Sequence, residues 1–317
     1  MTASRTNTGR PRPSWFTRFW AVVRYEMLWN IRKKKFIGVV IVAFVLATLS
    51  WALPLVSSSA TSQPINADPE YAVTFTVPAI GMFLFALITA MNSISSEFES
   101  GTIVPLLTKP VSRTMVFLGK LLAAFIIILV TYTILFVYVV IGGVLVYGPQ
   151  NNLQLVPLGL IGNILSTFVW IAIILAAGAL SKSTVISTLV ALGFFIGILF
   201  AVPIVSLFAG PSPALNYVPG SGASGTMITT QGPITVGAGT DNIGANLINY
   251  ALYPSANVDF NRTSLQIQDG QPRITQTFAY AEPVSLVTSR SIAMAAAYTI
   301  IFLIIAWIAF KRAQVLE

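Results

Sequence analysis

The chain has 317 residues, of which 55% are hydrophobic and 9% are charged, and its mean hydropathy is +0.80. An average soluble domain carries roughly a quarter charged residues, so the composition predicts an integral membrane protein. Cysteine and histidine are both absent, which excludes disulfides, thiolate chemistry, histidine-ligated metals and histidine-dependent triads. We therefore expect no enzyme activity, no catalytic residue and no metal site in this chain.

The formal net charge is +8 at pH 7. Many of the basic residues gather in the first 35 positions, without any fold signal for nucleic-acid binding. A basic flank of a membrane segment explains them better. The expected partner of this region is the lipid bilayer, and no nucleic acid is expected.

Residues 1–14 are polar and contain Pro11 and Pro13, so we expect a disordered cytoplasmic tail. In the following region, 15–35, apolar side chains recur at helical spacing and share one face. This pattern predicts an amphipathic elbow helix that lies on the cytoplasmic membrane surface, and an ordinary soluble helix is the alternative. The expected membrane-interface residues are Phe16, Phe19, Trp20, Val23, Met27 and Ile31.

Uncharged apolar runs predict the membrane spans, because about 20 such residues cross the hydrocarbon core of a bilayer. A cleaved signal peptide is the alternative for the first run, but that run is too long and further spans follow. We predict an all-α polytopic protein, with five spans within 36–208 and a sixth span plus a cytoplasmic tail within 290–317. The six runs are Phe36–Val56, Val73–Ile94, Leu121–Tyr147, Val156–Leu180, Thr184–Phe208 and Ser291–Phe310.

The distribution of lysine and arginine predicts the orientation of the spans, since cytoplasmic loops carry the excess of these residues. Basic residues lie in the N-terminal region, in the loop 95–120, at Lys182 and at Lys311-Arg312. The short loops on the other side lack them. We therefore expect a multi-pass protein of the plasma membrane with both termini in the cytoplasm.

No ionisable residue lies inside the six runs. A charge at the centre of a membrane helix costs about 2.5 to 3.5 kcal/mol on insertion scales and is normally kept for function. Its absence argues against proton relays, ion-coupled carriers and voltage sensors, and it favours a driving force supplied from elsewhere. Gly193 and Gly197 form a GxxxG pattern, which either lets another helix approach or reflects the frequency of glycine in membrane helices.

Residues 209–289, between spans five and six, are rich in Gly, Pro, Ser, Thr and Asn, and predict a small extracytoplasmic α+β insertion. Thr263–Phe278 reads as a hairpin with Asp269-Gly270 at its turn, and Met227–Val236 as a second hairpin. Asn242–Tyr253 predicts a short helix that dips into the outer leaflet.

Two motif matches fall in this insertion. Gly220, Gly222 and Gly225 fit GxGxxG, but no strand precedes them, so we do not expect a dinucleotide site. Asn261 opens an Asn-Arg-Thr sequon and is a possible glycosylation site.

The loop 95–120 is the only substantial charged segment between two long apolar runs. Ser96 and Glu99 have the spacing of a capping box, and Pro110 ends any helix that follows Gly101. A helix of about two turns, with Pro105 near its start, would be unstable alone and needs the lipid interface or a partner protein to dock on. Its apolar side would consist of Ile103, Leu106 and Leu107, and Arg113 and Lys120 would anchor the next helix at the headgroups.

The loop resembles the E-x-E-S-G-T…L-L-x-x-P-V-S-R…G-K pattern of ABC type-2 exporter permeases, the group that includes sodium-export, gliding-motility and copper-maturation permeases. The resemblance implies a permease that pairs with a second, identical or homologous permease chain and with two cytoplasmic ABC ATPase subunits. No cofactor would bind this chain directly, and ATP and Mg would belong to the ATPase subunits. The residues expected to couple to the ATPase are Glu97, Glu99, Ser100, Gly101, Thr102, Ile103, Leu106, Leu107, Pro110 and Arg113.

The sequence agrees with this resemblance on one independent point, because it contains no G-x-x-x-x-G-K-[ST] nucleotide-binding loop. ATP would therefore be hydrolysed by another chain. The main alternative is a secondary transporter or channel, and a membrane anchor for a working external domain is a further one. The substrate, and the choice between homodimer and heterodimer, stay open.

Overall fold

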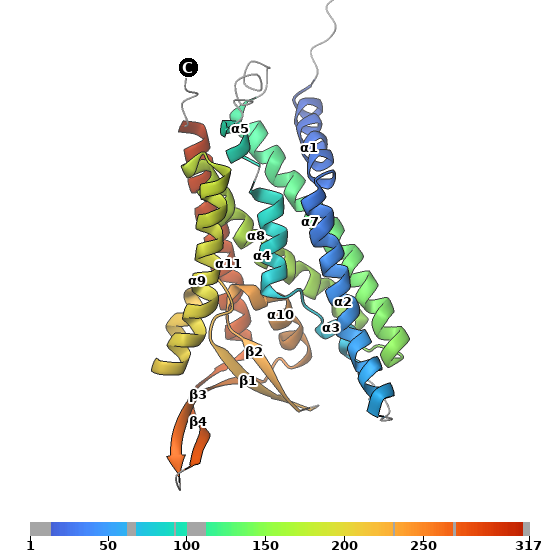
Figure 1. Cartoon of the computed structure of the whole chain (residues 1–317), viewed down its shortest axis with the longest axis vertical. Helices are drawn as coiled ribbons and strands as arrows, with labels where there is room; N and C mark the ends of the chain where they lie inside the picture. The colour runs from blue at the N-terminus through green and yellow to red at the C-terminus, as the bar shows by residue number, and fades with distance from the viewer. Residues whose placement is uncertain are drawn as a thin grey trace, which may run out of the picture.

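The computed structural model of the chain describes residues 14–61, 68–91, 93–99, 112–230, 232–268 and 271–312. Within these ranges, six helices are long and apolar enough to cross a membrane, as predicted. They run side by side in one bundle (Figure 1). The spans are α2 (Lys34–Thr61), α4 (Ala79–Ala90) with α5 (Ser95–Glu99), α7 (Arg113–Tyr147), α8 (Val156–Ser181), α9 (Thr184–Ala209) and α11 (Val284–Arg312).

The predicted N-terminal helix is present as α1 (Trp15–Ile31), and the Ser14 side chain caps it by accepting from the Thr17 N–H. The helix packs against α7, where a Cβ on Gly119 would lie 2.8 Å from a Val22 methyl. Of the predicted membrane-interface face, Val23 is buried against protein and Phe19 and Met27 are half-buried, whereas Phe16, Trp20 and Ile31 are exposed. The face is thus shared between α7 and the surroundings of the protein, and its place at a membrane surface stays a prediction.

The second span differs from the prediction of one continuous run from Val73 to Ile94. A short helix, α3 (Tyr71–Thr74), is followed by extended chain at 75–78 before α4 begins. Pro78 explains the break, because a proline disfavours helical geometry at the residue before it. The side chain of Asn163 on α8 accepts a hydrogen bond from the freed Val77 N–H at 2.9 Å.

Helix α8 forms the centre of the bundle and contacts α4, α7, α9 and α11. Its Trp170 is fully enclosed, with the Phe83 ring 5.5 Å and the Phe195 ring 5.1 Å from it between centroids. The edge-on arrangement of these rings is the one that aromatic quadrupoles favour. Three spans therefore meet at one aromatic cluster in the core.

The insertion contains a four-stranded antiparallel sheet in the order β2-β1-β3-β4, which confirms both predicted hairpins. The β3–β4 hairpin reaches away from the helices (Figure 1). Asp269 and Gly270, at the predicted turn of the first hairpin, lie outside the described residues. The elements are η1 (Leu153–Leu155), η2 (Pro213–Tyr217), β1 (Ser224–Thr229), β2 (Gly232–Gly237), η3 (Thr240–Asn242), α10 (Ile243–Leu252), β3 (Asn257–Gln268) and β4 (Gln271–Pro283).

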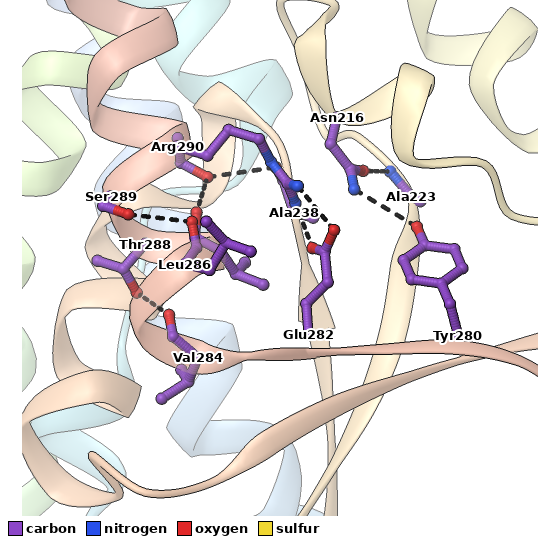
Figure 2. Close-up of polar contacts among 12 residues, drawn as sticks. Asn216, Ala223, Ala238, Tyr280, Glu282, Val284, Leu286, Thr288, Ser289 and Arg290 are labelled. Carbon is purple, nitrogen blue, oxygen red and sulfur yellow. Dashed lines mark hydrogen bonds and ion pairs between the residues drawn. The ribbon is translucent and has the colours of Figure 1, made fainter.

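The last span begins at Val284, immediately after β4, and so before the predicted start at Ser291. The prediction stopped there because Arg290 is charged. In the structure, Arg290 makes a two-pronged ion pair with Glu282 of β4, at 2.8 and 2.6 Å (Figure 2). Because this pairing neutralises the charge, Arg290 lies within the helix and ties it to the sheet.

Candidate functional site

The end of the bundle that carries α5, here called the α5 end, holds a buried ionic triad of Glu26, Lys120 and Glu97. The Lys120 ammonium lies 2.6 Å from the Glu26 carboxylate and 2.8 Å from the Glu97 carboxylate. The three side chains are 4%, 6% and 13% exposed for Lys120, Glu26 and Glu97, respectively. A lysine this deeply buried needs such partners, since an unpaired charge would lose its solvation without compensation. The triad joins α1, α5 and α7.

Lys33 lies beside the triad, in the turn between α1 and α2. Its ammonium donates a hydrogen bond to the Asn30 side chain at 2.8 Å. Burial lowers the pKa of Lys33 to about 8, while the Glu26 charge acts against this shift and the Lys120 and Lys35 charges reinforce it. Lys33 is therefore an incompletely neutralised cation.

Glu99, the last residue of α5, contacts the first turn of α9. Its carboxylate accepts from the Thr184 N–H at 2.8 Å and from the Ser183 hydroxyl at 2.9 Å. A negative charge at a helix N-terminus is favourable, because the free N–H groups there carry partial positive charge. The two acids of the E-x-E pattern thus hold different neighbours, since Glu97 holds the triad and Glu99 holds α9.

Arg113, the first residue of α7, connects this helix to the end of α11. Its guanidinium donates to the carbonyl of Lys311 at 2.9 Å and, more weakly, to that of Phe310 at 3.5 Å. Terminal helix carbonyls have no partner within their own helix, so an arginine is a suitable donor for them. Five helices, α1, α5, α7, α9 and α11, are consequently linked at the α5 end by charged groups.

Among the predicted coupling residues, the structure places Glu97, Glu99 and Arg113 together at the α5 end, each with a partner inside the chain. The predicted anchoring of Lys120 at the headgroups is wrong, because its side chain is buried in the triad. Glu26 was missed. A single acid in an otherwise basic N-terminal helix was the available signal for it. The other predicted coupling residues, Ser100, Gly101, Thr102, Ile103, Leu106, Leu107 and Pro110, lie outside the described residues.

Residues 238–252, here called the re-entrant segment, enter the bundle from the sheet end and turn back. Three contacts show how far the segment reaches along α8: a Cβ on Gly162 would collide with the Gly244 backbone, the Ser166 hydroxyl donates to the Thr240 carbonyl at 2.6 Å, and the Trp170 indole N–H donates to Asp241 at 2.9 Å. Trp170 lies 14 residues after Val156, or about 20 Å along the helix at 1.5 Å per residue. The turn of the segment therefore lies about halfway through the bundle.

Asp241, at the turn of the re-entrant segment, is a buried carboxyl group. Burial raises its pKa to about 7, and the hydrogen bond from Trp170 opposes that shift. No ion pair of Asp241 occurs within the ranges that the structure describes. The sequence did not reveal this group, because Asp241 lies outside every apolar run and only the folding of the insertion carries it between the helices.

The helix predicted at Asn242–Tyr253 is confirmed as α10, but its surroundings differ from the expected outer leaflet. It packs against α8 and α11, and its Asn246 side chain is fully buried. The Asn246 side-chain amide donates to the Gly237 carbonyl at 3.0 Å, and the Asn246 backbone carbonyl accepts from the Thr288 hydroxyl at 3.1 Å. Protein groups, and not lipid, therefore surround this face of α10.

A second set of polar contacts holds the sheet to α11 and to η2 (Figure 2). The Glu282–Arg290 pair joins the sheet to α11, and within the insertion the Asn216 side chain of η2 accepts from the Ala223 N–H at 2.9 Å and donates to the Tyr280 hydroxyl at 3.5 Å. Asn261 lies on β3 beside a β-bulge and is partly exposed, and its glycosylation stays a prediction. Of the glycines in the GxGxxG match, Gly222 allows a close backbone contact, because a Cβ there would meet the Gly239 backbone at 2.5 Å.

These features define a multi-pass membrane protein with charge pairing at one end and a re-entrant segment at the other. Within the ranges described, no three acidic side chains gather in a way that could hold a metal ion. Residues 20–315 match the family model described as ABC-2 family transporter protein. The chain belongs to this family, and is thus a transmembrane subunit of an ABC transporter and not itself its catalytic subunit. No similar sequence was found among curated proteins.

Proposed function

We propose that this chain is the permease of an ATP-driven exporter in the plasma membrane, and that it works with two separate ATPase subunits which bind ATP and Mg. A second permease chain, identical or homologous, would complete the complex. One observation carries the proposal: α5, which directly precedes the loop 100–111, is bonded to α7 through Glu97 and to α9 through Glu99, and Lys120 extends the first link to Glu26 of α1. Force applied to this loop would therefore reach α7 and α9 directly and α1 through Lys120.

The orientation follows from the same end of the molecule. Arg113, Lys182 and Lys311 all belong to the α5 end, where α11 also finishes (Figure 1). Because cytoplasmic flanks carry the excess of lysine and arginine, we assign the α5 end and both termini to the cytoplasm. The sheet and the re-entrant segment would then lie on the outer side.

Docking of the ATPase can be tested by co-purification. We expect the tagged chain, expressed with its natural neighbours and extracted in mild detergent, to bring down an ATPase subunit. The double variant Leu106→Asp/Leu107→Asp should abolish this association, because both leucines belong to the predicted apolar docking side. The matched control, Lys311→Ala/Arg312→Ala, changes the same end of the molecule and should retain it.

Two results would refute the proposal. One is a folded chain that purifies without any ATPase subunit and still transports in vesicles free of ATP. The other is equal retention of the ATPase by the leucine variant and the control.

A second candidate function, transport driven by an ion gradient, is favoured by the position of Asp241. Ionisable groups within membrane bundles often serve proton or ion pathways, and interrupted membrane segments occur in secondary transporters. For that function, an imposed pH gradient across vesicles of the purified chain should drive transport without ATP, and Asp241→Asn should abolish it. ATP-dependent transport that is unaffected by dissipating the pH gradient would exclude it.

A further inference from the structure

An apolar groove of about 440 Å³ lies where α1, α2 and α7 meet. Phe36, Val40 and Phe44 line it from α2, Val130 and Ile134 from α7, and Ile31 from the end of α1. Phe36 and Phe44 are eight residues apart, so the groove follows α2 for about 12 Å at 1.5 Å per residue. The groove thus runs along the helices, from the α1–α2 turn toward the middle of the bundle.

The groove is narrow. A volume of about 440 Å³ spread over such a length leaves too little width for another helix, whose diameter with side chains is about 10–12 Å. A single extended hydrocarbon chain has the shape that fits. The apolar lining and the direction of the groove, along the expected membrane normal, also suit such a chain.

A basic cluster lies at the α1 end of this groove. Arg32, Lys34 and Lys35 are exposed and lie in sequence between the lining residues Ile31 and Phe36. Among the described residues none of these three forms a salt bridge. Helix α2 begins at Lys34, so its free N–H groups add partial positive charge at the same place. An anion at this position would face both the basic side chains and the helix terminus.

Lys33 gives independent support for an anion at the groove. It lies in the α1–α2 turn, directly before α2 and three residues before Phe36, and the only direct hydrogen-bond acceptor of its ammonium within the described residues is the neutral Asn30 side chain. Burial lowers the pKa of Lys33 to about 8, despite the Glu26 charge and with Lys120 and Lys35 adding repulsion. A negative group beside Lys33 would relieve this repulsion.

We propose that this groove binds one acyl chain of an anionic phospholipid, with the lipid phosphate held by Arg32, Lys34 and Lys35. The two parts of the ligand match the two parts of the site, because the side chains that line the groove are apolar apart from Thr131, and the basic side chains and free N–H groups lie at its end. Bound lipid would fasten α1 to α2 and α7, next to the buried triad. This role is separate from the permease function and does not depend on it.

Native mass spectrometry of the purified chain can test the site, with dioleoyl phosphatidylglycerol as the anionic probe and dioleoyl phosphatidylcholine as its zwitterionic match. We expect one phosphatidylglycerol to be retained in preference to phosphatidylcholine. The triple variant R32Q/K34Q/K35Q should weaken this binding roughly 100-fold, because each basic residue near a membrane contributes about one kcal/mol of attraction to anionic lipid. The control K311Q/R312Q removes two charges elsewhere at the α5 end and should leave it unchanged.

A second pair of variants tests the groove without altering charge. Val130→Trp places an indole in the groove, whereas Val137→Trp places one at a similarly exposed position of α7 outside it. Only Val130→Trp should lose the retained phosphatidylglycerol. Equal retention of both lipids, equal loss in the charge variant and its control, or undiminished binding in Val130→Trp would overturn the proposal. A change in the number of chains per particle in Val130→Trp would also overturn it, since it would assign the groove to a second copy.

Discussion

At the α5 end, charged groups hold the helices together, whereas deep at the sheet end uncharged hydrogen bonds hold the re-entrant segment to α8 and α11. The first set contains the triad, the Glu99 contact to α9 and the Arg113 contact to α11. The second set contains Ser166 with Thr240 and Asn246 with Thr288. The two ends therefore differ in the free energy needed to separate their contacts.

Separating the neutral contacts would leave polar groups unpaired where no water replaces the lost partner, which costs about 1–3 kcal/mol for each group. The contacts at the α5 end include the exposed Glu99 and the half-buried Arg113, which can exchange their partners for water or for another protein. We therefore expect the sheet end to act as a fixed pivot, and the Glu99 and Arg113 contacts of the α5 end, but not its buried triad, to rearrange. The predictions below test this difference, from the largest expected effect to the smallest.

Removing the cation of the triad should have the largest effect. Lys120→Met leaves Glu26 and Glu97 buried and facing each other without compensation, and breaking a buried ion pair in this way costs about 3–5 kcal/mol. Chemical unfolding in detergent would measure the loss. Lys182→Met, at a more exposed lysine of the same end, is the control. An equal loss of unfolding free energy in both variants would show that the buried triad stabilises the fold no more than an exposed lysine does.

The close approach of α8 and α10 predicts the next largest effect. Gly162→Ala would bring a methyl group within 2.4 Å of the Gly244 backbone, which cannot yield as a flexible side chain can, so we expect a loss of about 3 kcal/mol. Gly193→Ala, also in a membrane helix, meets nothing within 4 Å and should stabilise the helix by up to about 1 kcal/mol. Thermal unfolding of the two variants would measure both. Equal changes in unfolding temperature in Gly162→Ala and Gly193→Ala would mean that the re-entrant segment does not pack on α8 as described.

The buried carboxyl of Asp241 predicts a dependence of stability on pH. Its pKa in the folded chain, about 7, lies above the ordinary 3.8, so between these pH values the folded chain binds a proton that the unfolded chain has lost. Stability should therefore fall as pH rises through this window, by about 2.6 kcal/mol between pH 5 and pH 8. Asp241→Asn keeps an acceptor for Trp170 and should remove this dependence. The control Asp259→Asn, on β3, should leave the dependence of stability on pH in place.

Much of the fold could be predicted because its signals are local. Length and polarity of apolar runs predict spans, and alternation around likely turns predicts hairpins, so α2, α7, α8, α9 and both hairpins were found. The start of α11 was misplaced because Arg290 reads as a boundary unless its partner Glu282 is known. The break before α4 has a local cause, Pro78, but its stabilising partner Asn163 lies 86 positions away.

The site was less predictable than the fold, because its contacts join residues that lie far apart in the sequence. The E-x-E pattern singled out Glu97 and Glu99, but their partners come from α7 and α9, which only the tertiary structure brings beside α5. Asp241 reads as one polar residue among many in a loop. Nothing near it in the sequence indicates that its chain enters the bundle.

The smallest effect on stability is expected at Glu99, because this carboxylate is exposed. Glu99→Gln keeps an acceptor for the Thr184 N–H and removes only the charge, whereas Glu99→Ala removes the cap of α9 altogether. Hydrogen exchange of the first turn of α9 should accelerate slightly in the glutamine variant and more in the alanine variant, with exchange in the re-entrant segment unchanged in both. If the re-entrant segment also exchanged faster, the two ends would not behave as a movable end and a fixed pivot, and the difference drawn between them would be wrong.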